Sequence, residues 1–444
     1  MQIKSSFLLI AMDQSASSES SNHSMKPIFV LLLAVVVDLL GFGLVIPILP
    51  FWTTKVIGAS ELMYGLLLSS FSLFQFIFAP VWGRISDRRG RRPVILIGLL
   101  GSVLGYGLLT ITALFFQTSL LLLFVSRFVQ GTFTAATLPT SQAYISDTTP
   151  PGPERTRGYG LLGAAFGFGF AIGPALGGIL TGLAELVLPS IRGYWAPALF
   201  ATLLAVINLL AAIRNLPEPV RHSSPAPNTH SILPQSSLSA LVETFVKNPV
   251  LVVVILLFAV VSLSFSSMQS TLVLLGEVRF GLDETGAGIM FLIIGVVTIV
   301  VQGRMIGPLS KKYDDTLLIV TSLIFLIIAF TGISTVQSFL VTVLWVIPLG
   351  IGVSVSNPTM NALLSKETPQ TQQGSILGIN QGLASLMRII GPIFGTLLFE
   401  MDVVFPYVSG VVLLGLSFIM SLGLMRLVSD AKLQKLTAPM VELK

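Results

Sequence analysis

The chain has 444 residues, of which 53% are hydrophobic and only 10% are charged, and it contains no cysteine. About a quarter of an ordinary soluble domain is charged, so this composition excludes a soluble protein, and its apolar content excludes intrinsic disorder. Without cysteine there are no disulfides, thiolate metal sites or cysteine nucleophiles. The three histidines lie in polar stretches, so we expect an all-α membrane protein with no metal and no cofactor.

Twelve apolar stretches are long enough, at about 20 residues, to cross the hydrocarbon core as helices. They are residues 28–50, 62–82, 93–115, 118–146, 156–182, 192–213, 249–271, 285–308, 314–334, 338–364, 372–398 and 402–428. The longest polar stretch, 214–248, divides them six and six, which predicts an N-terminal bundle at 26–213 and a C-terminal bundle at 249–428. We expect residues 214–248 to be a cytoplasmic linker. Residues 1–25 are predicted to be a disordered cytoplasmic tail, and residues 429–444 a second cytoplasmic tail.

Lysine and arginine gather in alternate loops, and this sets the expected orientation. With the N-terminus inside, the outer loops carry only Lys55, Arg192 and Arg279. Because basic loops stay on the cytoplasmic side, we expect a multi-pass plasma-membrane protein with both termini in the cytoplasm. The net charge of +5 is then a topology signal. We expect the lipid bilayer as a partner, no nucleic acid, and a monomeric protein.

The two groups of six spans resemble each other weakly. The fourth span contains Pro-Thr at 139–140 and Ser146, and the tenth contains Pro-Thr at 358–359 and Ser365, an offset of 219 residues. Other glycine and proline positions recur in the same order at nearly the same offset. This pattern indicates a duplicated six-span unit, and such repeats place a substrate site between the halves near the middle of the membrane.

Asp38, in the first span, is the acidic residue that lies in the middle of a predicted span. An ionised carboxylate at the bilayer centre costs about 2.5–3.5 kcal/mol, so Asp38 must face a cavity or a partner. Arg127 lies at a similar depth in the fourth span. Two interpretations stay open: a static ion pair that fixes packing, or a proton-coupling site in which Asp38 binds and releases about one proton per cycle.

The most distinctive string in the sequence joins the second and third predicted spans and ends at Pro93. Its informative residues are Gly83, Asp87, Arg88, Gly90, Arg91 and Arg92. We expect the two glycines to allow close approach and positive φ angles in a tight loop, and Asp87 to stay ionised and paired among the arginines. A basic membrane anchor explains the arginines but not the acid or the glycines.

This string resembles motif A of the major facilitator superfamily, and three other segments resemble parts of the same family. Arg127 and Gly131 resemble motif B, and the stretch from Asp38 to Pro50 resembles the first-helix signature of the 12-span drug/proton antiporters, the tetracycline antiporters in particular. The fifth span resembles motif C of proton-coupled antiporters through Gly163, Gly167, Gly169, Gly173, Pro174, Gly177 and Gly178. These glycines predict close helix packing.

The resemblance implies twelve helices in two pseudo-symmetric bundles and proton-coupled export of a small amphiphilic compound by alternating access. It also implies a latch formed by Asp87, Arg91 and Asp147, which holds the halves closed on the cytoplasmic side. The second half has Lys311 where the acid would recur, so we expect this latch to be one-sided. Gly105 stands where the tetracycline antiporters have an acid, which disfavours a metal–tetracycline chelate as substrate.

Polar and aromatic residues within the spans mark candidate walls of a substrate cavity. The candidates are Phe42, Gln75, Gln130, Ser266, Gln269, Asn357, Asn361, Asn380 and Arg388. Arg388 would suit an anionic group of the substrate, although a structural role is equally compatible with the sequence.

No catalytic triad or P-loop is present, so we expect neither an enzyme nor an ATP-driven pump. Two other functions stay open. One is a facilitator or proton symporter for a sugar or an organic anion. The other is a membrane receptor or scaffold that uses the same fold without transport.

Overall fold

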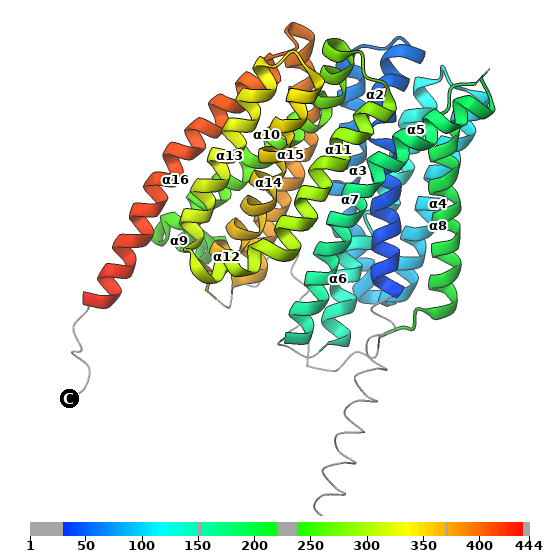
Figure 1. Ribbon diagram of the computed structural model, residues 1–444. Coiled ribbons are helices and arrows are strands. Elements are labelled where there is room, and N and C mark those ends of the chain that lie inside the picture. Colours follow the sequence, from blue (N-terminus) through cyan, green and yellow to red (C-terminus); the bar gives the residue numbers. More distant parts are fainter. Residues whose placement is uncertain (1–29, 150–152, 190, 220–237, 370–371, 438–444) are drawn as a thin grey trace, which may run out of the picture.

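The structure is a computed structural model that describes residues 30–149, 153–189, 191–219, 238–369 and 372–437, and all of its elements are helices (Figure 1). A first helix spans residues 30–45. The rest of the first half comprises α2 (Ile48–Phe51), η1 (Trp52–Val56), α3 (Glu61–Arg89), α4 (Arg91–Phe115), α5 (Leu120–Thr134), α6 (Thr137–Thr148), α7 (Pro153–Val187) and α8 (Trp195–Asn215).

The second half repeats this pattern of long helices with shorter pieces between them. It comprises α9 (Leu238–Lys247), α10 (Pro249–Phe280), α11 (Glu284–Val300), η2 (Val301–Met305), α12 (Ile306–Lys312), α13 (Asp315–Thr335), α14 (Phe339–Glu367), α15 (Gln373–Met401) and α16 (Phe405–Thr437). Figure 1 shows α10 and α13 to α16 as one group, beside the group formed by the helices up to α8.

In the described part of the chain, eleven helical spans are long and apolar enough to cross a membrane. The remaining predicted span, the fifth at residues 156–182, lies in α7, whose described apolar part is the shorter segment Ile172–Val187. The sequence prediction of an all-helical membrane fold is therefore confirmed. Helices dominate because a backbone in hydrocarbon must satisfy its own hydrogen bonds.

Helices are also present outside the two predicted bundles. The segment predicted as a linker contains the ten-residue helix α9, and α16 continues to Thr437, into the predicted C-terminal tail. The predicted tail at residues 1–25 lies outside the described residues. The span prediction depends on an apolar run of about 20 residues, which the ten-residue α9 is too short to provide and the charged last turns of α16 do not provide.

The first span and α7 pack backbone against backbone through glycines. A Cβ atom on Gly173 would lie 2.7 Å from the Cα of Gly43, and one on Gly177 would lie 2.1 Å from the carbonyl oxygen of Leu44. Gly169 makes a similar approach to the same helix. Any side chain would separate the helices, so the small residues of α7 are needed for this seam.

The two halves meet along two helix pairs, in which α3 packs against α15 and α7 packs against α11. Glycines again allow the approach: a Cβ on Gly65 would lie 2.1 Å from Oγ1 of Thr396, and one on Gly178 would lie 2.4 Å from the carbonyl oxygen of Glu284. These close contacts lie away from the loop between α3 and α4. We call the end at residues 84–92 the Arg-rich end, and the other the opposite end.

Replacing Gly177 with alanine should destabilise the protein, because the added methyl group meets the Leu44 carbonyl oxygen at 2.1 Å. Overpacking of this kind costs about 1–3 kcal/mol. Thermal unfolding of the purified protein in detergent measures the effect. The matched control is Gly415→Ala in α16, where a Cβ meets nothing within 4 Å; equal melting temperatures for the two variants would contradict the packing account.

Candidate functional site

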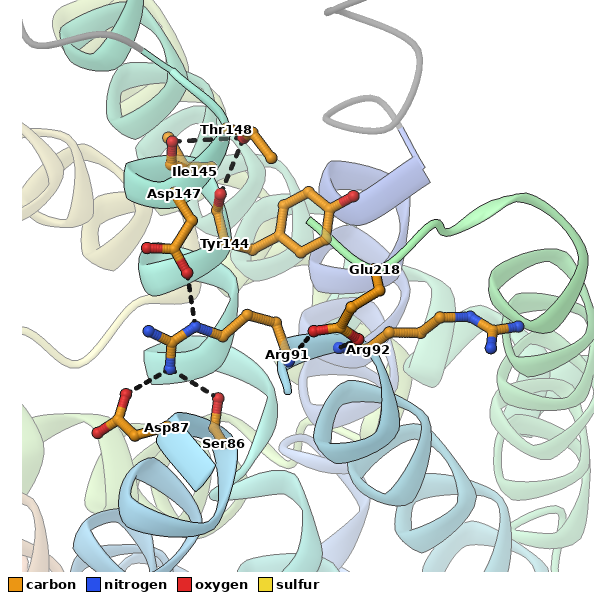
Figure 2. Close-up of polar contacts among 9 residues, drawn as sticks. All are labelled: Ser86, Asp87, Arg91, Arg92, Tyr144, Ile145, Asp147, Thr148 and Glu218. Atoms are coloured by element: carbon orange, nitrogen blue, oxygen red, sulfur yellow. Dashed lines mark hydrogen bonds and ion pairs between the residues drawn. The ribbon is translucent and has the colours of Figure 1, made fainter. Parts of the chain in front are cut away.

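Arg91 is the centre of an ion-pair cluster at the Arg-rich end (Figure 2). Its Nε donates to Oδ2 of Asp147 at 2.8 Å, and its Nη1 donates to Oδ1 of Asp87 at 2.6 Å and to Oγ of Ser86 at 3.0 Å. The Arg91 side chain is only 12% exposed, whereas that of Asp87 is 66% exposed. The cluster joins three helices, α3, α4 and α6, all of which belong to the first half.

Glu218 completes this cluster from the segment that follows α8. Its Oε1 accepts a hydrogen bond from the backbone N–H of Arg91 at 2.6 Å, and its Oε2 accepts one from the N–H of Arg92 at 2.9 Å (Figure 2). The carboxylate therefore satisfies the first two free N–H groups of α4 and sits at the positive end of its dipole. It also offsets the unfavourable position of the Arg91 cation at that helix end.

The two glycines of this region have different roles. Gly90 adopts a φ of 102° and ends α3, and a Cβ there would lie 2.5 Å from the Glu218 carboxylate. Gly83 lies inside α3, and a Cβ there would meet nothing within 4 Å. The expectation that Gly83 serves a tight loop is therefore wrong, because α3 continues as helix to Arg89.

The remaining arginines of the motif point elsewhere. Arg92 donates from Nη2 to the carbonyl oxygen of Ile213 at 2.7 Å, which ties α4 to the end of α8. Tyr144 donates to the carbonyl oxygen of Pro217 at 3.0 Å and fixes the same segment. Arg88 is exposed.

The second half contains a related ion pair, but the pair lies within that half, so the expectation of a one-sided latch between the halves stays a prediction. Lys366 Nζ lies 2.5 Å from Oδ2 of Asp315. The two residues come from the end of α14 and the start of α13, and the Asp315 side chain is only 7% exposed. The expectation rested on whether the acid at Asp87 recurs in the second half. It therefore did not include a pair in which the acid and the base have exchanged positions.

Asp38 lies in the first span with its side chain against α4. Ser102 donates a hydrogen bond to its Oδ1 at 2.6 Å, and the Tyr106 hydroxyl donates to its backbone carbonyl at 3.3 Å. Asp38 itself is half-buried. No ion pair joins Asp38 to Arg127 among the described residues, so the predicted direct pair gives way to a hydroxyl contact.

Arg127 and Gln130 present unused hydrogen-bond donors inside the bundle. Arg127 is 2% exposed and Gln130 is 1% exposed. Nε and Nη2 of Arg127 and Nε2 of Gln130 are buried without a hydrogen-bond partner among the described residues. Such unpaired donors are costly, which favours an acceptor that arrives in another state of the protein.

Gln130 also occupies the position that an acid on α4 would need. A Cβ on Gly105 would lie 2.1 Å from Cγ of Gln130. The glutamine side chain therefore fills the place expected for an acid in the tetracycline antiporters.

The candidate cavity residues are distributed over both halves. Phe42 packs against Phe71 with ring centroids 5.2 Å apart, while Gln75 and Gln269 are half-buried and Ser266 is buried beside Gly391. In the second half, Asn380 donates to Oδ1 of Asn361 at 3.2 Å, and Asn361 donates to the carbonyl oxygen of Asn357 at 3.0 Å.

Arg388 is exposed although it lies within α15. Its Nη2 donates to Oγ of Ser385 at 2.9 Å. Gln381 is exposed one turn before Ser385, so a polar face runs along this helix. The exposed guanidinium of Arg388 is thus a candidate contact for a ligand.

Four polar contacts close the opposite end between described residues of the two halves. They are Lys55 with Glu277, Leu62 with Glu400, Ser69 with Ile389 and Tyr194 with Glu284. Thr285 adds a hydrogen bond to the carbonyl oxygen of Gly178 at 3.2 Å. Here the halves are held together at the opposite end.

The motif C glycines Gly173, Gly177 and Gly178, with Pro174, lie on the faces of α7 that meet the first span and α11. Gly163 and Gly167 lie in α7, but their surroundings are outside the described detail.

Sequence reasoning missed Glu218, Ser102 and Tyr106. The signal for Glu218 is an isolated acid between two prolines directly after the sixth span. The signal for the other two is a pair of polar residues four apart on one helix face, at the depth of Asp38.

Replacing Glu218 with alanine should loosen the start of α4, because loss of a helix cap costs about 0.5–2 kcal/mol. Hydrogen–deuterium exchange of the peptide that contains Arg91 and Arg92 should become several-fold faster. Glu243→Ala is the control, since Glu243 pairs with Lys247 on the separate helix α9. Unchanged protection at Arg91 and Arg92 would show that the cap does not stabilise this loop.

Comparison with known proteins identifies relatives over nearly the whole chain. The family described as Major Facilitator Superfamily matches residues 31–392. Multidrug resistance protein 2 of Bacillus subtilis is 30% identical over 414 residues, covering 91% of this chain and 96% of that protein. The class H tetracycline resistance protein of Pasteurella multocida is 28% identical, covering 86% of this chain and 90% of that protein.

Solved structures agree with this match. The human organic anion transporter MFSD10 has a TM-score of 0.64 and 25% sequence identity, covering 90% of this chain and 99% of that chain. The nucleoside transporter NupG has a TM-score of 0.70 at 14% identity, covering 90% of this chain and 99% of that chain, and shares the fold.

Proposed function

Because the chain belongs to the major facilitator superfamily, we propose that it exports a small amphiphilic compound in exchange for protons, by alternating access. Relatives of nearly full length are named for tetracycline and multidrug resistance, which supports export. The observation that carries proton coupling is Asp38, a half-buried carboxylate in the first span whose side chain accepts one hydrogen bond among the described residues, from Ser102.

Asp38 is partly exposed, which gives a proton access to the carboxylate, and no cation pairs with it among the described residues. Ser102 stabilises its charged form through a hydrogen bond at 2.6 Å. A proton on the carboxylate removes the charge and weakens this contact, which allows the first span to shift against α4. Arg127 lies at a similar depth in the membrane, and two of its donor atoms have no partner among the described residues. It can therefore donate to an acceptor when that shift occurs.

Alternating access follows from the placement of the contacts between the halves. The opposite end is closed by polar contacts such as Ser69 with Ile389 and Tyr194 with Glu284. The ion pairs of Arg91, in contrast, lie within the first half. We propose that this arrangement faces the cytoplasm, that both termini are cytoplasmic, and that the protein acts as a monomer in the plasma membrane.

One carboxylate in the middle of the spans sets the proposed coupling. About one proton per cycle would then exchange for one substrate molecule. Exchange for a monovalent cation is electroneutral, whereas exchange for a neutral compound moves one charge, worth about 2.3 kcal/mol per 100 mV of membrane potential.

A substrate with an anionic group is a second candidate. Arg388 is exposed on α15 and contacts only a neutral hydroxyl among the partners described for it. Nε and Nη2 of Arg127 and Nε2 of Gln130 also have no partner within the described part of the chain. Gln130 fills the place of an acid beside Gly105, which argues against a metal chelate. A facilitator, a symporter and a scaffold without transport are the remaining alternatives.

Replacing Asp38 with asparagine should abolish proton release coupled to substrate, because an amide cannot carry the proton. Everted vesicles energised with a proton gradient provide the assay, with ethidium as a cationic probe and fluorescein as an anionic one. Wild-type vesicles should lose part of the gradient when the transported probe is added, and Asp38→Asn vesicles should not.

Ser102→Ala is the matched control, because it keeps the carboxylate and removes its hydrogen bond; it should retain coupling at a shifted pH. Probe flux without proton movement in wild type and Asp38→Asn alike would point to a facilitator. Absence of flux for every tested compound would favour the scaffold.

Replacing Asp87 with asparagine should slow transport several-fold while leaving expression unchanged. The exposed Asp87 contributes little to folding, and Arg91 keeps its bonds to Asp147 and Ser86. Uptake of the transported probe into everted vesicles, normalised to protein amount, measures the effect. Asp402→Asn, at the opposite end, is the control; a wild-type rate for Asp87→Asn would remove this residue from the transport cycle.

A further inference from the structure

The ion-pair cluster of the first half is repeated in the second half with its charges exchanged. Arg91 is the first residue of α4, and Asp315, at the matching position 224 residues later, is the first residue of α13. Asp147, near the end of the fourth span, matches Lys366, near the end of the tenth, at the repeat offset of 219. Both pairs are formed, Arg91 with Asp147 at 2.8 Å and Asp315 with Lys366 at 2.5 Å.

A third position follows the same rule. Asp87, near the end of α3, matches Lys311, near the end of α12, at the offset of 224. Both side chains lie on exposed residues. All three positions of the cluster have therefore reversed their charge between the halves, and the buried member is in each case the first residue of a long helix.

The exchange also explains the capping carboxylate of the first half. A cation at the start of a helix is unfavourable, so Arg91 is accompanied by Glu218 on the first two N–H groups of α4. At the start of α13 the buried residue is Asp315, which is itself the favourable charge for that helix end.

The packing of the halves determines which positions can meet when the Arg-rich end closes. Because α3 packs against α15, which begins shortly after Lys366, we expect closure to bring the end of α3 with Asp87 toward Lys366. α7, which follows Asp147 in the chain, packs against α11, which leads through α12 to Lys311. We therefore expect closure to bring Asp147 toward Lys311. The pseudo-two-fold relation between the halves makes these two pairs equivalent.

We propose that Lys311 and Lys366 are positioning residues that attract Asp147 and Asp87 across the two halves in the state closed at the Arg-rich end. An unchanged copy of the cluster would place acid opposite acid at both points. With the charges exchanged, Lys311 lies opposite Asp147 and Lys366 opposite Asp87. Each half therefore keeps its own ion pair and is also attracted to the other half. This inference rests on the proposed alternating access.

The test uses Lys311→Asp, which makes the contact with Asp147 repulsive and leaves the Asp315–Lys366 pair intact. Since the chain has no cysteine, a single cysteine at the exposed Gln381 of α15 reports access to the interior. A charged, membrane-impermeant methanethiosulfonate reagent should label it about threefold faster in everted vesicles of the variant, consistent with the modest strength of exposed ion pairs. In intact cells labelling should become slower.

Lys312→Asp is the matched control, because it makes the same charge change one residue further along α12 without a matching acid. Its labelling rate should equal that of the parent protein. In the parent, high salt should speed labelling, since it screens exposed charges, and Lys311→Asp should lose this response. Equal rates for Lys311→Asp and the parent, or equal effects of the two substitutions, would overturn the proposal. The readout needs no transported compound, so it is independent of the Asp38 experiment.

Discussion

Hydrocarbon offers no hydrogen bonds to the backbone and little stabilisation to a charge, and this constraint accounts for most of what the structure contains. Long helices satisfy their own N–H and C=O groups, so the described chain is built of helices. Charged side chains are driven to the helix ends, where water and partners are available. The few that stay inside, Asp38, Arg127 and Arg388, are therefore the residues whose presence calls for a functional reason.

On our proposal, the helix ends control the transport cycle, and the structure has two kinds of contact there. At the opposite end, glycines such as Gly65 and Gly178 let the backbones of the two halves touch, and a few side-chain contacts complete the closure. At the Arg-rich end, Arg91 and Asp315 form ion pairs inside their own halves. Backbone contact is short-ranged, whereas charge acts over several ångströms, so the two ends respond differently to small movements.

Most of the fold could be predicted from the sequence because a membrane span needs a run of about 20 apolar residues, which is visible without tertiary information. The contact of Arg91 with Asp147 was implied by a family resemblance. The partner of Asp38 was not predictable, since sequence gives its depth in the membrane but not the direction of its side chain around the helix. That direction places Ser102, not Arg127, against the carboxylate.

Other parts of the site depend on neighbours far away in the chain. Glu218 lies 127 residues from Arg91 and reaches it only because α8 ends beside the start of α4. Gly83 was expected in a loop because it belongs to a loop motif, yet α3 extends beyond it. The Asp315–Lys366 pair was visible in the sequence, but a search for identical residues does not find opposite charges at matching positions.

The exchanged charges also constrain how the two halves can change over generations. A substitution at Asp147 disturbs Arg91 within its own half and, on our proposal, Lys311 in the other half. A single charge reversal therefore breaks two contacts at once, and only a compensating change elsewhere restores them. These six positions should therefore change together, as paired bases of an RNA stem do when a substitution in one strand is compensated in the other. If the halves arose by gene duplication, all three charges were reversed together in one copy.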